Sequence, residues 1–82
     1  MPQAERTQNI IELLKWLSHQ ESAVRRSAVI AYVKTEITEM GGTERTIMGY
    51  LRDCVNYALV EEKGARFKIT NYGLKWLERH SH

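Results

Sequence analysis

A short glycine-containing interruption between two helical patterns is the feature that most constrains the fold of this chain. Residues 27–40 and residues 43–58 each carry apolar side chains at helical spacing. Between the two apolar stripes lies the segment Met40-Gly41-Gly42-Thr43. Glycine takes the left-handed conformation that ends a helix, and a threonine side chain can cap the next one. The sequence therefore predicts two helices joined by a tight turn, a helix-turn-helix.

The size and composition of the chain limit what else it can contain. With 82 residues it has room for one domain, spanning residues 1–82, and for no deep cleft between domains. Its net charge of +2 permits nucleic acid as a partner without requiring it. The polar amino-terminal segment lacks the apolar core of a signal peptide, and no apolar run is long enough for a membrane span. We therefore expect a soluble, cytoplasmic domain with no membrane partner.

The residues before the helix-turn-helix predict one more helix and a short extended segment. Residues 5–18 form a first amphipathic helix, because their apolar side chains fall on one stripe. Residues 23–26 do not fit the apolar face of the following helix, so we expect them to be extended. Ser27 can accept a hydrogen bond from a free N–H group, which predicts it as the N-cap of the helix over residues 27–40.

After residue 58 the hydrophobic pattern changes from helical to strand-like. Residues 59–69 contain two short strand-like runs around Gly64, which predicts a β-hairpin. Thr70 can cap a last helix over residues 71–80, and Gly73 can let that helix approach a neighbouring backbone closely. The sequence thus predicts an α+β domain that is mostly helical.

The carboxy-terminal half resembles a winged helix-turn-helix domain. The runs that carry the resemblance are Tyr57-Ala58-Leu59-Val60-Glu61-Glu62-Lys63-Gly64 and Phe67-Lys68-Ile69-Thr70-Asn71-Tyr72-Gly73-Leu74-Lys75-Trp76-Leu77. Small archaeal and archaeal-virus winged-helix regulators have a similar strand, glycine-bearing turn and helix start. The resemblance implies that residues 43–58 are a recognition helix and residues 59–69 a wing. It also implies a regulator of transcription, of archaeal or viral source, that binds double-stranded DNA.

One stripe of the predicted recognition helix has side chains suited to a DNA major groove. Arginine can pair with guanine, asparagine with adenine, and glycine allows close approach. The stripe consists of Arg45, Gly49, Arg52 and Asn56. Thr43 and Thr46, at the start of the helix, are predicted to reach phosphates together with free N–H groups. Asp53 and Glu44 argue against DNA because they repel phosphate, so a merely solvated face is the alternative.

The predicted wing carries a second group of basic residues. They are Lys63, Arg66 and Lys68. Basic side chains at a hairpin tip can lie against phosphates or enter a minor groove. Glu61 and Glu62 adjoin them, so an ordinary charged hairpin is the alternative. Arg25 and Arg26, before the helix-turn-helix, are interpreted either as contacts to the DNA backbone or as an exposed charged pair.

Aromatic residues on the two terminal helices suggest self-association. Trp16 lies off the apolar stripe of the first helix, while Tyr72 and Trp76 share one face of the last. We expect a homodimer that buries these three residues, because aromatic side chains dominate the centres of interfaces. The alternative is that both tryptophans cover the edges of the core of their own chain.

The sequence shows no pattern typical of an enzyme. The three histidines form no ligand-spaced cluster, and there is no glycine-rich phosphate loop or nucleophile elbow. Cys54 lies on the core side of its helix, which predicts a buried small side chain and no reactive thiol. We therefore expect no catalysis, metal or cofactor. The alternative function is a protein-interaction module, an accessory subunit of a replication or transcription complex, which the near-neutral charge favours.

Overall fold

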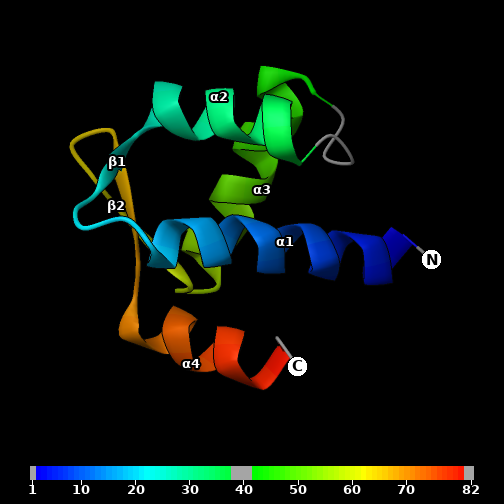
Figure 1. Cartoon of the computed structure of the whole chain (residues 1–82), viewed down its shortest axis with the longest axis vertical. Helices are drawn as coiled ribbons and strands as arrows, with labels where there is room; N and C mark the ends of the chain where they lie inside the picture. The colour runs from blue at the N-terminus through cyan, green and yellow to red at the C-terminus, as the bar shows by residue number, and fades with distance from the viewer. Residues whose placement is uncertain (1, 38–41, 81–82) are drawn as a thin grey trace.

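A computed structural model describes residues 2–37 and 42–80 of the chain. This part of the chain is α+β and mostly helical, with four helices and one three-stranded antiparallel sheet. The elements in chain order are α1 (Pro2–Ser18), β1 (Val24–Arg25), α2 (Arg26–Glu36), α3 (Glu44–Asn56), β2 (Val60–Lys63), β3 (Arg66–Ile69) and α4 (Asn71–His80). Figure 1 shows α1 between α2 on one side and α4 on the other, with the sheet at one end of α1.

The sheet has the strand order β1-β3-β2, so the predicted extended segment becomes an edge strand beside the hairpin. Val24 pairs with Phe67 on β3, which itself pairs with Glu62 on β2. The hairpin turn consists of Gly64 and Ala65, both with positive φ, at 58° and 63°. Two consecutive residues of this kind make a turn whose twist matches that of antiparallel strands. The predicted hairpin is confirmed.

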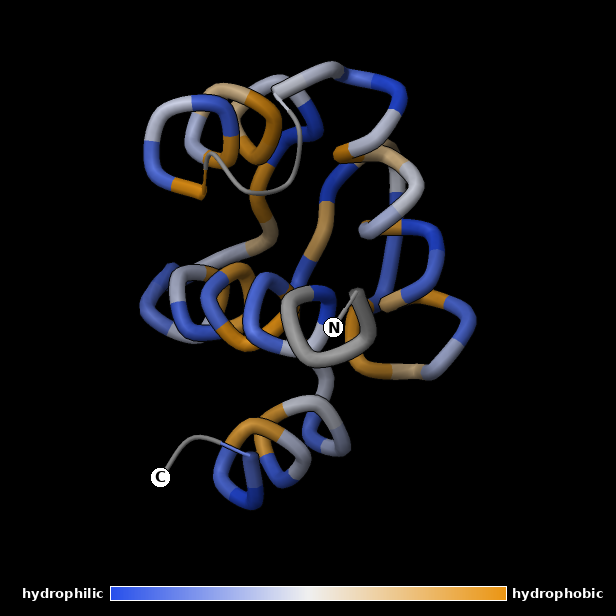
Figure 2. Tube along the Cα trace, turned by 90° about the vertical axis from the view of Figure 1, so that its right-hand side faces the viewer, coloured by the Kyte–Doolittle hydropathy of each residue, from blue (hydrophilic) through white to orange (hydrophobic). Residues whose placement is uncertain are grey.

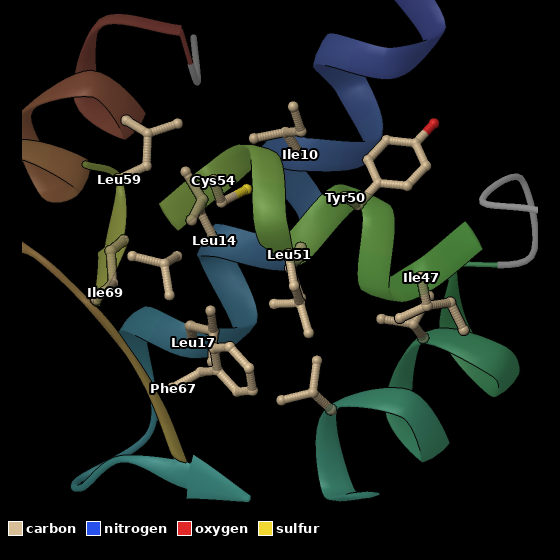
Figure 3. Close-up of a cluster of buried hydrophobic side chains, with 14 of the residues drawn as sticks. Ile10, Leu14, Leu17, Ile47, Tyr50, Leu51, Cys54, Leu59, Phe67 and Ile69 are labelled. Carbon is tan, nitrogen blue, oxygen red and sulfur yellow. The ribbon is translucent and has the colours of Figure 1, made fainter. Parts of the chain in front are cut away.

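The core lies between α1, α2, α3 and the sheet, and it uses the apolar stripes expected from the sequence. Hydrophobic residues recur along every helix between hydrophilic ones, as expected for elements that bury one face (Figure 2). Phe67 and Ile69 extend this core to the inner face of the sheet, as Figure 3 shows. The buried helical stripes, with Ile37 directly after α2, consist of Ile10, Leu13, Leu14, Leu17, Val29, Ile30, Val33, Ile47, Tyr50, Leu51 and Cys54.

Helix α4 is attached to the rest of the molecule through Thr70 and Gly73, as predicted. The Thr70 hydroxyl oxygen accepts a hydrogen bond from the Gly73 N–H (2.8 Å) and its O–H donates to the Ala58 carbonyl (2.5 Å). A Cβ on Gly73 would lie 2.1 Å from the Leu59 carbonyl oxygen, so no larger residue fits there without displacing backbone. Thr70 thus caps α4 while Gly73 lets it approach the start of the hairpin.

Both amino-terminal boundaries of the first two helices differ from the prediction. Helix α1 begins at Pro2 instead of residue 5, which suits proline because the first helical N–H needs no partner within the helix. Helix α2 begins at Arg26, and its N-cap is Arg25 with no side-chain cap, so the assignment of Ser27 as N-cap is wrong. The reason is tertiary: β1 runs directly into α2, and the Arg26 N–H donates to the Ala65 carbonyl of the hairpin (3.2 Å).

The carboxyl end of α2 also falls earlier than predicted. The helix ends at Glu36 and not at residue 40, because Ile37 leaves the helical conformation (φ −123°, ψ 67°). Ile37 is nevertheless only 3% exposed, so its apolar side chain continues the periodic pattern past the true end of the helix. Met40 and Gly41, which we expected in the turn, lie outside the described residues.

Helix α3 ends at Asn56, two residues before the predicted end at residue 58. Ala58 takes a positive φ of 62°. Its N–H donates to the Val55 carbonyl (3.0 Å), and the Leu59 N–H donates to the Cys54 carbonyl (2.9 Å). This pair of bonds is the Schellman arrangement that ends many helices, usually with glycine at the positive-φ position. Alanine there gives no sequence signal for a stop, which explains the error.

Candidate nucleic-acid interface

The stripe of α3 that was predicted to read bases points away from the core. Its start is fixed by Thr43, whose hydroxyl oxygen accepts a hydrogen bond from the Thr46 N–H (3.2 Å), as expected of an N-cap. At Gly49 a Cβ would meet no atom of the described residues within 4 Å, so the helix surface is open there. The exposed residues of this surface are Thr43, Arg45, Thr46, Gly49, Arg52 and Asn56.

The hairpin brings together basic residues that are far apart in the sequence. Arg66 on β3 lies opposite Lys63 on one side and opposite Arg25 on the other. Directly opposed residues of antiparallel strands point to the same face, so the three cations form one row across the sheet. All three side chains are exposed, and none has an ion-pair partner among the described residues. Opposed like charges destabilise a sheet, which makes this row a surface that an anion would stabilise.

Lys68, the third basic residue expected on the hairpin, is placed differently. It is exposed, but it lies opposite Glu61 in the β2–β3 register. Opposed unlike charges attract across strands, so Glu61 offsets the charge of Lys68. The basic row of Arg25, Lys63 and Arg66 therefore carries more unbalanced positive charge than the base of the hairpin.

Arg26 connects the hairpin to α3. It lines a surface pocket of about 380 Å³ at the hairpin tip with Arg25 and Arg66. It also lines a second pocket of about 380 Å³, which includes Arg52 and Asn56 of α3. Sequence analysis left Arg25 and Arg26 as either contacts or a solvated pair. The pairing of β1 with β3 brings Arg25 and Arg26 to this surface. A strand of two residues is too short for its pairing partner to be recognised from the sequence pattern.

Three acidic residues lie near this surface, in different settings. Glu62 lines the second pocket with Arg26 and Arg52, and Glu44 is exposed at the start of α3. Asp53, which we expected to repel phosphate, forms an ion pair with Arg6 of α1. The charge of Asp53 is thus balanced by Arg6, a residue that the sequence did not single out. Glu62, which shares a pocket with Arg52 and Asn56, has no ion-pair partner among the described residues.

The comparisons with known proteins gave no match: no family model, no curated protein and no solved structure corresponds to this chain. The residues that the structure describes contain no group of histidine, cysteine and acidic side chains arranged to hold a metal ion. Within the same residues, no helix is long and apolar enough to cross a membrane. The geometry of the chain's own residues therefore carries the functional argument.

The aromatic residues expected at a dimer interface lie in two different places, Trp16 against α2 and the other two on α4. Trp16 stacks on Tyr32 of α2, with ring centroids 4.2 Å apart and an interplanar angle of 8°. Trp76 stacks on His80 (4.1 Å) and packs against the edge of the core, as Trp16 does. Tyr72 is 57% exposed. The two carboxy-terminal aromatics line a groove of about 410 Å³ between α1 and α4, together with Arg6, Thr7, Ile10, Tyr57 and Leu59.

The single cysteine of the chain lies in the core, as expected. Cys54 is fully buried on the inner side of α3 (Figure 3). Burial raises the pKa of its thiol to about 11, and the positive charge of Arg6 opposes that shift only in part. The thiol therefore stays protonated near neutral pH, which leaves it a poor nucleophile.

Proposed function

We propose that this chain is a double-stranded-DNA-binding protein with a winged helix-turn-helix architecture, acting as a regulator of transcription. In this proposal α3 enters the major groove as the recognition helix. The β2–β3 hairpin is the wing, and its basic row lies against backbone phosphates. Bases are read by Arg45, Arg52 and Asn56, whose donor and acceptor groups suit guanine and adenine.

The observation that carries the proposal is that cations from α3, the start of α2 and the hairpin share one surface. Arg26 lines one pocket with Arg66 of the hairpin and a second with Arg52 of α3, which Glu62 also lines. None of these three arginines has an ion-pair partner among the described residues. Exposed cations held together without partners are the electrostatic pattern expected of a phosphate-binding surface.

A salt titration of binding to a random-sequence duplex tests the proposal. Each phosphate contact releases a counterion, so the slope of log K against log salt reports the number of contacts. Arg66→Ala should lower this slope by about one unit and weaken binding to every sequence. Lys75→Ala is the matched control, because Lys75 is an exposed cation on α4, outside both pockets. Equal slopes for the two variants would contradict a phosphate role for the hairpin.

The base-reading role of α3 needs a sequence-selection experiment. Arg52→Ala and Asn56→Ala should each weaken binding to the selected site by about 1–3 kcal/mol and relax preference at one position. Both side chains are exposed, so the variants should fold normally. If both variants keep the affinity and the preference of the unaltered protein, α3 does not read bases.

We propose also that the α1–α4 groove binds a second copy of the chain. Tyr57 and Tyr72 line it, and they are the two most exposed of the large hydrophobic residues in the described chain, at 67% and 57%. A twofold dimer would bury both and would give one α3 helix to each half-site of a DNA operator. The contribution of Trp16 expected from the sequence is no longer needed, since the ring of Tyr32 already covers it.

Sedimentation tests the dimer directly. The unaltered protein should sediment near twice 9.6 kDa at micromolar concentration. Tyr72→Glu should give a folded monomer, whereas Leu74→Glu, an exposed position of α4 outside the groove, should leave the dimer intact. A monomeric protein would favour the second candidate function, a protein-interaction module, with the same groove as the docking surface for another protein.

A further inference from the structure

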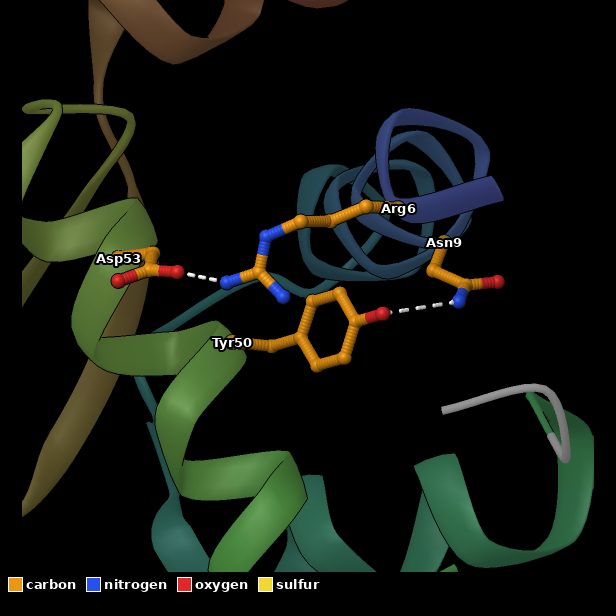
Figure 4. Close-up of polar contacts among 4 residues, drawn as sticks. All are labelled: Arg6, Asn9, Tyr50 and Asp53. Atoms are coloured by element: carbon orange, nitrogen blue, oxygen red, sulfur yellow. Dashed lines mark hydrogen bonds and ion pairs between the residues drawn. The ribbon is translucent and has the colours of Figure 1, made fainter. Parts of the chain in front are cut away.

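One carboxylate beside the base-reading stripe of α3 forms an ion pair with an arginine from another helix. Asp53 lies about 60° around α3 from Asn56, which is three residues further along the helix. Arg6 of α1 forms an ion pair with Asp53, as Figure 4 shows. Among the described residues this is the only ion pair. Arg6 is thus paired with the acid at the edge of the proposed DNA surface.

Two further contacts fix the guanidinium of Arg6 in place. It lies 4.4 Å from the ring centroid of Tyr50, a cation–π contact on α3. Tyr50 is buried, and its hydroxyl oxygen accepts a hydrogen bond from the Asn9 side-chain amide (3.2 Å). Asn9 is one turn along α1 from Arg6. The arginine therefore meets Asp53 in a geometry that two packed helices define (Figure 4).

Stability alone gives a weak reason for this ion pair. The side chains of Arg6 and Asp53 are 42% and 37% exposed, and ion pairs this exposed add little to folding free energy. The effect on a polyanion is different in kind. DNA carries one negative charge per roughly 1.7 Å of helix axis, so an uncompensated carboxylate at the edge of a groove-binding helix would face several phosphates.

We propose that Arg6 is a positioning residue for DNA binding, which neutralises Asp53 so that the edge of α3 does not repel phosphates. Arg6 acts through Asp53 and makes no contact with DNA itself. The inference rests on the proposed function, since it concerns how α3 accepts DNA.

A charge-balanced set of variants tests this role. Arg6→Gln leaves Asp53 uncompensated, so binding to a random-sequence duplex should weaken about three- to fivefold at low salt. Asp53→Asn leaves the positive charge of Arg6 without its carboxylate partner, so the variant should bind tighter than the unaltered protein by a similar factor. The double variant R6Q/D53N restores the original net charge and should bind like the unaltered protein. Arg6→Lys keeps the positive charge and should lose less affinity than Arg6→Gln. Because Arg6 also lines the α1–α4 groove, the variants are compared at concentrations where sedimentation shows the same oligomeric state for each.

These four affinities separate the proposal from its competitors. If Arg6 contacted phosphate directly, the double variant would remain as weak as Arg6→Gln. If the ion pair served only to hold α3 in place, Asp53→Asn would weaken binding. Either result, or an unchanged affinity for Arg6→Gln, overturns the inference. The differences should also shrink as salt is raised, because the effect is electrostatic.

Tyr50→Phe supplies the structural control. It removes the partner of the buried Asn9 amide without changing any charge, so it should lower stability while leaving DNA affinity unchanged. If Tyr50→Phe lost as much affinity as Arg6→Gln, the Arg6–Asp53 ion pair would act through helix packing, and the inference would be overturned. If the unaltered protein binds no DNA in the salt titration, the proposed function and this inference are overturned together. If it binds DNA but the variants do not show the expected order of affinities, only the inference is overturned.

Discussion

Helices α3 and α4 each begin at a threonine cap and each contain one glycine, yet the two glycines have opposite surroundings. A Cβ on Gly73 of α4 would meet the Leu59 carbonyl oxygen at 2.1 Å and the Ile69 side chain at 2.8 Å. A Cβ on Gly49 of α3 would meet nothing within 4 Å. In α4, packing requires a residue without a side chain at position 73. In α3, no contact among the described residues requires glycine at position 49.

The surface of α4 at Gly73 is therefore packed against the rest of the protein, whereas the surface of α3 at Gly49 is open to solvent. Glycine in a helix interior lowers stability by roughly 0.5–1 kcal/mol relative to alanine. At Gly73 that loss is offset by close packing of α4 on the hairpin. At Gly49 the monomer offers no compensating contact, which is what a helix surface that must come close to DNA would show.

Gly73→Ala should be the most damaging substitution. The added methyl group would displace the Leu59 carbonyl, which accepts a hydrogen bond from the Thr70 N–H (3.0 Å). We expect the free energy of unfolding to fall by about 3 kcal/mol, as measured by urea denaturation. A variant as stable as the unaltered protein would show that α4 does not pack this closely on the hairpin.

Thr70→Val should come next, because it keeps the shape of the side chain but removes its hydroxyl. The variant loses the cap on the Gly73 N–H and the bond to the Ala58 carbonyl, so we expect a loss of about 2 kcal/mol in urea denaturation. Thr43→Val is the matched control on α3. Thr43 is exposed. It caps the Thr46 N–H and donates only to the exposed Thr46 hydroxyl, a bond that water can replace, so its loss should be about 1 kcal/mol. Equal losses would remove the distinction between the two caps.

Gly49→Ala should have two opposite effects. Stability should rise by about 1 kcal/mol, because alanine favours the helix and the position is open. Binding to the selected DNA site should weaken, because the methyl group stands where α3 would approach the groove. The two measurements are thermal unfolding and DNA titration. A more stable variant with unchanged DNA affinity would show that DNA does not come close to this part of α3.

Ala58→Gly should give the smallest effect, a gain of about 0.5 kcal/mol. Ala58 has a φ of 62°, a conformation that glycine adopts without strain. Thermal unfolding measures the gain. Ala31→Gly is the control, because Ala31 is an exposed residue inside α2 and its replacement should lower stability by about 1 kcal/mol. A loss of stability in both variants would mean that the end of α3 is not strained.

Sequence analysis located every element but misplaced several ends. Local signals were sufficient where a side chain acts on its own backbone, as Thr43 and Thr70 do in capping α3 and α4. They failed at Arg25, because the backbone of the hairpin there takes the place of a capping side chain. They failed again at Ala58, because the positive-φ position that ends a helix is usually a glycine and is here an alanine.

The candidate site divides in the same way. Helical periodicity alone identified Arg45, Gly49, Arg52 and Asn56 as one exposed stripe, because the repeat of an α-helix fixes which residues share a face. Periodicity within one element says nothing about its neighbours. The alignment of Arg25 with Arg66 depends on strand pairing across 41 residues of chain, and the neutralisation of Asp53 by Arg6 depends on the packing of α1 against α3.

The order of elements, the apolar stripes and the exposed face of α3 therefore follow from local spacing in the sequence. Which charges meet depends on how the elements pack together. The Coulomb energy between two charged side chains depends on their distance in space and not on their separation along the chain. The positions of the helices and strands therefore decide whether Arg6, the basic row and the acidic residues attract or repel one another. The balance of charge at the α3 surface, on which DNA binding would depend, is for that reason a property of the folded chain.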